Sequence, residues 1–254
     1  MIVTDKFVFI HLPRTGGTFV SDIIRKFFPS AHELGYHLPR SLLPREYSHL
    51  PVLGGVRNPW EFYTSWYHHQ QPQTRHSPLF CGLSDNRTLD FANTIQNALN
   101  LGVSEETLNR LILELPNNFN FEDKHIPNVT RELMSGIRGT GLGLFTYRFN
   151  LMFGKADDVY FCRVESLRQD LLAFFDGIGA ANDALRSHVI DSDKKNISEH
   201  CHYSTYYTPE LAELVFIRDR AIIDRFGYTF EQISYAGKET SIDFKEKLKA
   251  GQTN

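Results

Sequence analysis

Residues 6–18, KFVFIHLPRTGGT, read as a strand, a tight turn and the start of a helix. The run from 6 to 12 is short, mostly apolar and rich in aromatic and β-branched side chains, which favours a buried strand that ends at Pro13. Beyond the paired glycines, apolar residues recur at helical spacing until Pro29 stops the pattern. We therefore expect a strand, a glycine turn and a helix at the start of the chain.

The same order recurs further along the chain. Residues 51–57 (PVLGGVR) predict a second buried strand, and residues 59–69 predict a helix with proline at its first position. A third strand is expected at 158–164 (DVYFCRV), and the pattern of residues 209–226 predicts one long helix. Strands that alternate with helices indicate an α/β fold, with a parallel sheet and helices on both of its faces.

The composition is that of an ordinary globular protein of 254 residues, with 41% apolar and 22% charged side chains. Since no linker or repeat divides the chain, we expect one domain over residues 1–235 and a charged tail over residues 236–254. The formal net charge is −3, so no overall basic field attracts nucleic acid. An anionic ligand must therefore be captured by a local group of charges.

The cysteines and the chain start bear on the compartment. Cys81, Cys162 and Cys201 are widely spaced and odd in number, so they predict neither a disulfide framework nor a zinc knuckle. The first residues lack the pattern of a signal peptide, and no run reaches the ~18 apolar residues of a membrane span. We expect a cytoplasmic protein without a membrane span.

The turn after the first expected strand has the chemistry of an anion site. Its glycines let the backbone turn tightly and approach a ligand, and the N–H groups of the following helix point at an anion. An arginine adds a fixed positive charge, and two threonine hydroxyls can donate to phosphate oxygens. A turn without a ligand is the alternative for a lone glycine pair. The motif consists of Pro13, Arg14, Thr15, Gly16, Gly17 and Thr18.

A second candidate follows the second expected strand. Arg57 is placed at the carboxyl edge of the sheet, and Ser65 comes two turns into the next helix, so both can face one phosphate. A surface ion pair and an ordinary helix serine are the alternatives. The NTPase loop G-x-x-x-x-G-K-[ST] does not fit, because the glycine spacing differs and no lysine follows Gly17. A kinase or ATPase is therefore disfavoured.

Taken in order, these motifs resemble those of the PAPS-dependent sulfotransferases, in particular the carbohydrate-type branch. FIHLPRTGGTFV is similar to the 5′-phosphosulfate loop of that family, and VRNPWEFYTSWY is similar to its 3′-phosphate motif. Further likeness lies in VYFCRVESLRQDLLAFF, in LGLFTYRF and in the run from Lys194 to Tyr228. The resemblance implies a P-loop-type three-layer fold, with a central parallel sheet flanked by helices.

The resemblance also implies a cofactor and site residues. PAPS would be the sulfuryl donor and PAP the product, with no metal required, and Arg14 would contact the bridging oxygen of the phosphosulfate. The acceptor would be a hydroxyl or amine, on a glycan or a glycosylated small molecule. The donor-binding residues would be Pro13, Arg14, Thr15, Gly16, Gly17 and Thr18 in the loop, Arg57 and Ser65 at the 3′-phosphate, and Asn196 and Ser198 in a late loop.

Attack by the acceptor requires a base within hydrogen-bond reach. The candidates are Glu33 and His37 in AHELGYHLP, where relatives place their base. We prefer His37, because an imidazole titrates near neutral pH with little perturbation, whereas Glu33 would need its pKa raised by burial. Two other functions stay open at this stage: an inactive PAP-binding protein, and an atypical P-loop kinase.

Overall fold

The computed structural model of the chain describes residues 1–74, 77–118, 129–154, 157–193, 195, 198–233, 239–242 and 244. Its described residues form two compact units. Unit 1 comprises those within Met1–Arg57 and Arg148–Ile197, and unit 2 those within Asn58–Asn118, Val129–Tyr147 and Ser198–Asn254. The expectation of a single domain over residues 1–235 stays a prediction.

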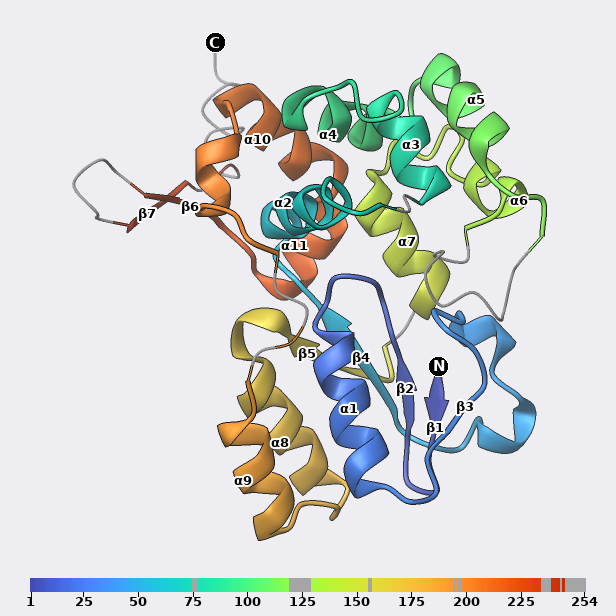
Figure 1. The fold of residues 1–254 in the computed structure, drawn as a ribbon, viewed down its shortest axis with the longest axis vertical. Helices are drawn as coiled ribbons and strands as arrows, with labels where there is room; N and C mark the ends of the chain where they lie inside the picture. Colours follow the sequence, from blue (N-terminus) through green and yellow to red (C-terminus); the bar gives the residue numbers. More distant parts are fainter. Residues whose placement is uncertain are drawn as a thin grey trace. The chain divides into compact units, whose positions relative to one another are not determined.

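Unit 1 is a mixed α/β structure built on a five-stranded sheet (Figure 1). The strand order is β3-β1-β2-β4-β5, with β2, β4 and β5 parallel and β1 antiparallel to both of its neighbours. These three parallel strands lie at the positions that the sequence predicts. The strands are β1 (Ile2–Val3), β2 (Val8–Ile10), β3 (His32–Glu33), β4 (Val52–Val56) and β5 (Val159–Arg163).

The strands β1 and β3 were not predicted from the sequence, and β1 runs antiparallel to its neighbours, so an all-parallel sheet was wrong for this edge. A turn at Thr4 explains the β1–β2 hairpin. The Thr4 hydroxyl accepts the N–H groups of Lys6 and Phe7 and donates to the Phe7 carbonyl at 2.9 Å. The amino group of Met1 donates to the Gly35 carbonyl and so holds the segment after β3 beside β1. Strands of two residues carry too little periodicity to be recognised.

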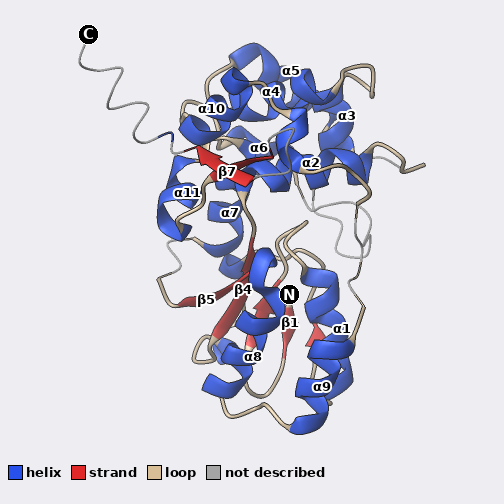
Figure 2. Cartoon of the chain, turned by 90° about the vertical axis from the view of Figure 1, so that its left-hand side faces the viewer, coloured by secondary structure: helices blue, strands red, loops and turns tan. Residues whose placement is uncertain are grey.

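Helices pack on the sheet of unit 1, and aromatic side chains form much of the core between them. Figure 2 shows α1, α8 and α9 side by side next to the strands. Phe7 of the β1–β2 segment lies at the centre of this core, with ring centroids 5.0 Å from Phe28 and 5.3 Å from Phe174. On the opposite face, Gly54 of β4 leaves room for the ring of Phe153. The helices are α1 (Gly17–Phe27), α8 (Leu167–Gly177) and α9 (Asp183–Asp191), with 3₁₀ turns at Arg40–Leu42, Arg45–Tyr47 and Val164–Ser166.

Unit 2 is mainly helical. Its helices are α2 (Pro59–Gln70), α3 (Pro78–Ser84), α4 (Phe91–Asn100), α5 (Glu105–Glu114), α6 (Arg131–Ser135), α10 (Pro209–Arg218) and α11 (Arg220–Phe226), with a 3₁₀ turn at Tyr203–Tyr206. The predicted helix over 209–226 was wrong as one element, because Asp219 leaves the helical conformation between α10 and α11. Strands β6 (Phe230–Ile233) and β7 (Glu239–Ile242) pair antiparallel. The second of them falls within the predicted tail 236–254, whose other residues except Phe244 lie outside the described part.

Helix α7 (Leu144–Phe153) begins in unit 2, and its residues from Arg148 onward belong to unit 1. None of the helices that the structure describes has the length and apolar character needed to cross a bilayer.

Candidate functional site

The predicted phosphosulfate loop joins β2 to α1 in unit 1. Gly16 is the N-cap residue of α1 with φ 78°, and Arg14 has φ 65°, so the chain turns sharply twice before the helix begins. Because this N-cap residue is a glycine, it has no side chain that could cap α1. In the described structure the first turn of α1 carries no acidic residue. The N–H groups of this turn have no partner within the helix, which suits an anion. Side chains cap other helices, at Asn58, Ser77, Asp90, Ser104, Thr130, Asn182 and Thr208.

Two glycines hold the loop in this position by leaving out a side chain. A Cβ atom at Gly17 would overlap the ring of His11. A Cβ atom at Gly55 of β4 would lie 2.6 Å from the carbonyl oxygen of Thr15, so the loop rests directly on the second strand. The second glycine was not recognised as a site residue from the sequence. Its signal is the pair Gly54-Gly55 inside an otherwise apolar strand.

The two loop threonines differ in their surroundings. The Thr15 hydroxyl is buried and donates to the Leu12 carbonyl at 2.7 Å, so its one proton serves the loop itself. In this conformation Thr15 can offer a ligand only its backbone N–H. Thr18, on the first turn of α1, is partly exposed. The phosphate contacts of both residues stay predictions.

The two predicted arginines of the site are brought together in unit 1. Arg57 Nη1 donates to the carbonyl of Arg14 at 3.3 Å, which links the turn after β4 to the loop after β2. Burial, followed by the charge of Arg57, lowers the pKa of Arg14 to about 10, and Tyr36 acts in the opposite direction. Two like charges in a partly desolvated position are stabilised by an anion between or beside them.

Next to the loop lies a buried pair of imidazoles. The rings of His11 and His37 have centroids 4.5 Å apart, and the Tyr36 ring lies 4.0 Å from His37. His37 Nδ1 is 2.7 Å from the His11 carbonyl, so this nitrogen carries the proton and Nε2 is the acceptor. Burial lowers the pKa of His11 to about 3 and the pKa of His37 well below its usual value, where the neighbouring His11 contributes as well.

The lowered pKa of His37 bears on which residue accepts the proton of the acceptor. The preference for His37 assumed an unperturbed imidazole, and that assumption was wrong, because His37 is only 8% exposed. A neutral His37 still has an acceptor nitrogen, but it is a weaker base than the sequence suggests. Glu33, at the end of β3, receives a hydrogen bond from Arg25 at 2.9 Å. The choice between the two residues stays a prediction.

In unit 2 the structure brings together two predicted donor-binding serines. Ser65 lies in α2, and its hydroxyl is 3.0 Å from that of Ser198, although 133 residues separate them in the chain. Both side chains are buried. Ser198 therefore contacts the helix that carries Ser65 of the second motif. Asn196 lies outside the described residues.

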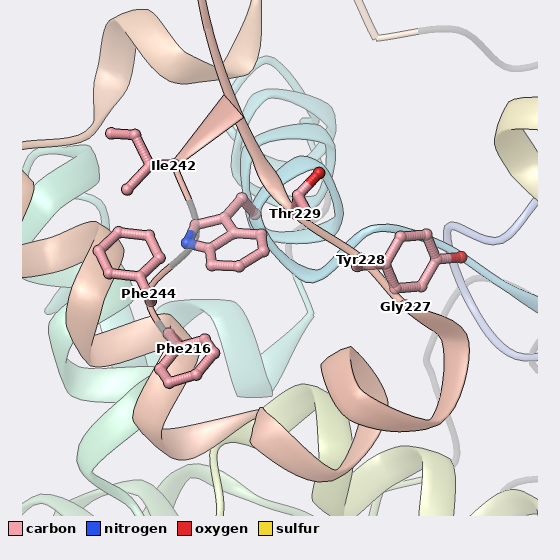
Figure 3. Close-up of a pocket in the computed structure, with 7 residues that line it drawn as sticks. Phe216, Gly227, Tyr228, Thr229, Ile242 and Phe244 are labelled. Carbon is pink, nitrogen blue, oxygen red and sulfur yellow. The ribbon is translucent and has the colours of Figure 1, made fainter. Parts of the chain in front are cut away.

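A small aromatic pocket also occurs in unit 2 (Figure 3). Phe216 and Phe244 line it together with Trp60, whose ring stacks on Phe244 with centroids 6.0 Å apart. The cavity volume is about 80 Å³. Ligand pockets start at roughly 300 Å³, so this one is too small for a nucleotide.

Chemically, the described residues of unit 1 form a cationic turn at a helix N-terminus, with neutral imidazoles beside it. Among the described residues, no group of three or more His, Cys, Asp or Glu side chains is placed to hold a metal ion. Comparison of the chain with protein-family models, with curated proteins and with solved structures found no match.

Proposed function

We propose that this protein is a PAPS-dependent sulfotransferase, which transfers a sulfuryl group to a hydroxyl or amine of a carbohydrate or small-molecule acceptor. The observation that carries the proposal is the pair Arg14 and Arg57 beside the uncapped N-terminus of α1. This arrangement suits a nucleotide with two anionic groups, with the phosphosulfate at Arg14 and the helix N-terminus and the 3′-phosphate at Arg57. The parallel strands β2, β4 and β5, with α1 following the first of them, support a P-loop-type three-layer fold.

The transfer is an in-line displacement in which positioning and charge stabilisation dominate. The acceptor oxygen or nitrogen forms a bond to sulfur while the bond from sulfur to the 5′-phosphate oxygen breaks, and PAP leaves with the electron pair. Arg14 and the N–H groups of α1 stabilise the charge that develops on the leaving oxygen. Arg14 stays charged at neutral pH, so it acts through its charge and not as an acid. The acceptor proton passes to His37 or Glu33.

The remaining predicted residues bind the donor. The resemblance assigns Arg57 and Ser65 to the 3′-phosphate, and Asn196 and Ser198 to the loop over the donor. The 3.0 Å contact between the Ser65 and Ser198 hydroxyls supports the pairing of these two residues, because it brings Ser65 of the 3′-phosphate motif next to Ser198 of the late loop.

The experiment is a calorimetric titration of the full chain with PAP and with adenosine 5′-phosphosulfate, which lacks the 3′-phosphate. Arg57→Ala should weaken PAP binding by at least tenfold, since a charge-assisted bond contributes roughly 1.5–3 kcal/mol, and should change adenosine 5′-phosphosulfate binding far less. Arg25→Ala, which removes an exposed arginine of α1, is the control and should change neither.

Equal losses for the two nucleotides would remove Arg57 from the 3′-phosphate. Absence of PAP binding by the wild-type protein, or tighter binding of ATP with magnesium, would overturn the sulfotransferase proposal itself.

A further inference from the structure

Two polar atoms at the end of α2 are buried without a partner. No described residue forms a hydrogen bond with His68 Nε2 or with Gln71 Oε1, and neither atom is open to solvent. The two residues are three positions apart in the last turn and C-cap of the helix, so their side chains leave α2 on the same face. A polar atom that is buried without a partner costs free energy. A group bound by both atoms would remove that cost.

A second imidazole joins this cluster from the late loop, two residues after Ser198. The ring of His200 lies 5.5 Å from the ring of His68, with an angle of 30° between the two planes. His200 Nδ1 is 2.7 Å from the carbonyl oxygen of Cys201, so this nitrogen carries the proton and Nε2 keeps its lone pair. The hydroxyl of Tyr206 accepts the Cys201 N–H at 3.0 Å and so holds the backbone beside His200 in place. A ring fixed by a backbone carbonyl at one nitrogen is the usual arrangement of a histidine that binds a metal at the other.

The surroundings of His68 keep its ring neutral. Phe91 and Tyr206 pack on it, with ring centroids at 6.3 Å and 4.5 Å. Burial, followed by the charge of His200, lowers the pKa of His68 below its usual value. A neutral imidazole offers a lone pair, and this is the form that metal ions bind.

The spacing of the two rings suits a shared ion. Two imidazoles that bind one zinc ion at about 2.0–2.1 Å have ring centroids roughly 4.5–6 Å apart. The separation of His68 and His200 falls within this range. Gln71 supplies an amide oxygen from the same helix face as His68. Because the third donor is an amide, this cluster is compatible with the lack of any group of three His, Cys, Asp or Glu side chains among the described residues.

We propose that His68, Gln71 and His200 bind one Zn²⁺ ion. The two imidazoles bind it through Nε2, the amide binds it through Oε1, and a water molecule completes a tetrahedral shell. Mg²⁺ and Ca²⁺ do not suit the site, because both prefer oxygen ligands. The ion ties the late loop to α2, beside the contact between Ser65 and Ser198, and its binding is independent of PAPS binding.

A calorimetric titration of the full chain with zinc chloride tests the site. The wild type should bind Zn²⁺ at this cluster, and His68→Ala and His200→Ala should each weaken that binding by roughly tenfold or more, because each removes a ligand. Gln71→Ala should weaken it less, since imidazole is the ligand that Zn²⁺ prefers. His49→Gln, which removes an exposed imidazole of unit 1, is the matched control and should leave the affinity unchanged.

Co²⁺, which occupies zinc sites and absorbs visible light strongly when it is tetrahedral, gives a second measurement on the same proteins. The wild type should show these visible bands, and His200→Ala should lose them. His200 is partly exposed, so its substitution should leave the fold intact, which circular dichroism checks. Zn²⁺ should also raise the Tm of the wild type and leave that of His200→Ala unchanged.

Unchanged zinc affinity in either histidine variant would overturn the site, and so would the absence of zinc binding by the wild type. Cys201→Ser distinguishes an imidazole site from binding by the exposed thiol beside it, and should change the zinc affinity little. If this variant loses binding as the histidine variants do, the ligand set is wrong. PAP enters none of these measurements, so the zinc site stands or falls separately from the sulfotransferase proposal.

Discussion

At the residue scale, the candidate site depends on two glycines, because a side chain at either position would collide with a neighbouring residue. Gly17 makes room for the ring of His11, and Gly55 makes room for the backbone of Thr15. The paired glycines of the loop could be recognised from the sequence because they follow a strand and precede a helix. The pair Gly54-Gly55 marks a close approach at β4, but the partner of Gly55 comes from a segment 40 residues earlier in the chain, and only the fold shows that this partner is Thr15.

Gly55→Ala tests this packing. The added methyl would lie 2.6 Å from a carbonyl oxygen, which a backbone cannot move away from cheaply, so we expect a loss of stability of roughly 1–3 kcal/mol and weaker PAP binding. Urea unfolding and a PAP titration measure the two effects. Gly177→Ala at the end of α8 meets no atom within 4 Å and should change stability by less than about 0.5 kcal/mol. Equal effects of the two substitutions would contradict the role of Gly55.

The pKa of His37 is a second property that depends on the folded structure. The sequence places a histidine soon after the first helix, and its type suggests an ordinary pKa. Burial and the contact with His11 set the actual value, and neither is visible before the chain folds. The backbone of His37 also has φ 52°, a left-handed conformation that asparagine tolerates better than most residues. His37→Asn therefore removes the imidazole and keeps a side chain that this conformation tolerates.

At the element scale, the break between α10 and α11 serves the start of α7. Asp219 is fully buried, and its carboxylate accepts the Thr146 N–H at 2.8 Å and the Tyr63 hydroxyl at 2.7 Å. The same hydroxyl accepts the Phe145 N–H at 3.1 Å. The helical pattern of residues 209–226 hides this break, because the reason for it lies some 70 residues earlier in the chain, at Phe145 and Thr146. Capped starts such as those of α4 and α5 were predictable, since Asp90 and Ser104 are adjacent to the helices they cap.

Tyr63→Phe tests this connection between elements. The change leaves the Phe145 N–H and one oxygen of Asp219 without a partner in a dry interior, so unfolding should become easier by roughly 1–3 kcal/mol. Denaturant unfolding followed by tryptophan fluorescence measures the loss. Tyr67→Phe, in the same helix, removes only a long contact of 3.5 Å to a carbonyl and should cost less. A loss that is the same in both variants would refute the network.

At the scale of the whole molecule, local order was predictable and distant pairing was not. The three parallel strands and the loop after the first one follow from periodicity, proline and glycine. The contact between Ser65 and Ser198 joins residues 133 apart, so it needed the folded chain. Residues predicted separately from two motifs nevertheless meet within each unit, Arg14 with Arg57 and Ser65 with Ser198. The sequence thus predicts which types of side chain bind a ligand more readily than it predicts which of them lie next to each other.

The two units should respond to acid with opposite signs. In unit 1 the folded pKa values of His11 and His37 are lowered, so the unfolded chain binds protons first and stability falls as the pH drops below about 6.5. In unit 2 burial raises the pKa of Asp219 to about 6, so the folded chain keeps a proton that the unfolded chain loses near pH 4. That contribution is present at low pH and is lost as the pH rises to about 6.

Two variants separate these contributions. Both tryptophans, Trp60 and Trp66, lie in unit 2, so their fluorescence follows that unit in urea unfolding from pH 4 to pH 7. The stability of the wild type relative to Asp219→Asn should decline by about 3 kcal/mol across this range, because a shift of two pKa units corresponds to that free energy. Hydrogen exchange of the β4 amides reports the stability of unit 1. Because His37→Asn removes one group that takes up a proton on unfolding in acid, the stability of this variant should fall less steeply with decreasing pH than that of the wild type. A variant profile parallel to that of the wild type in either unit would show that the group named there does not change its charge on folding.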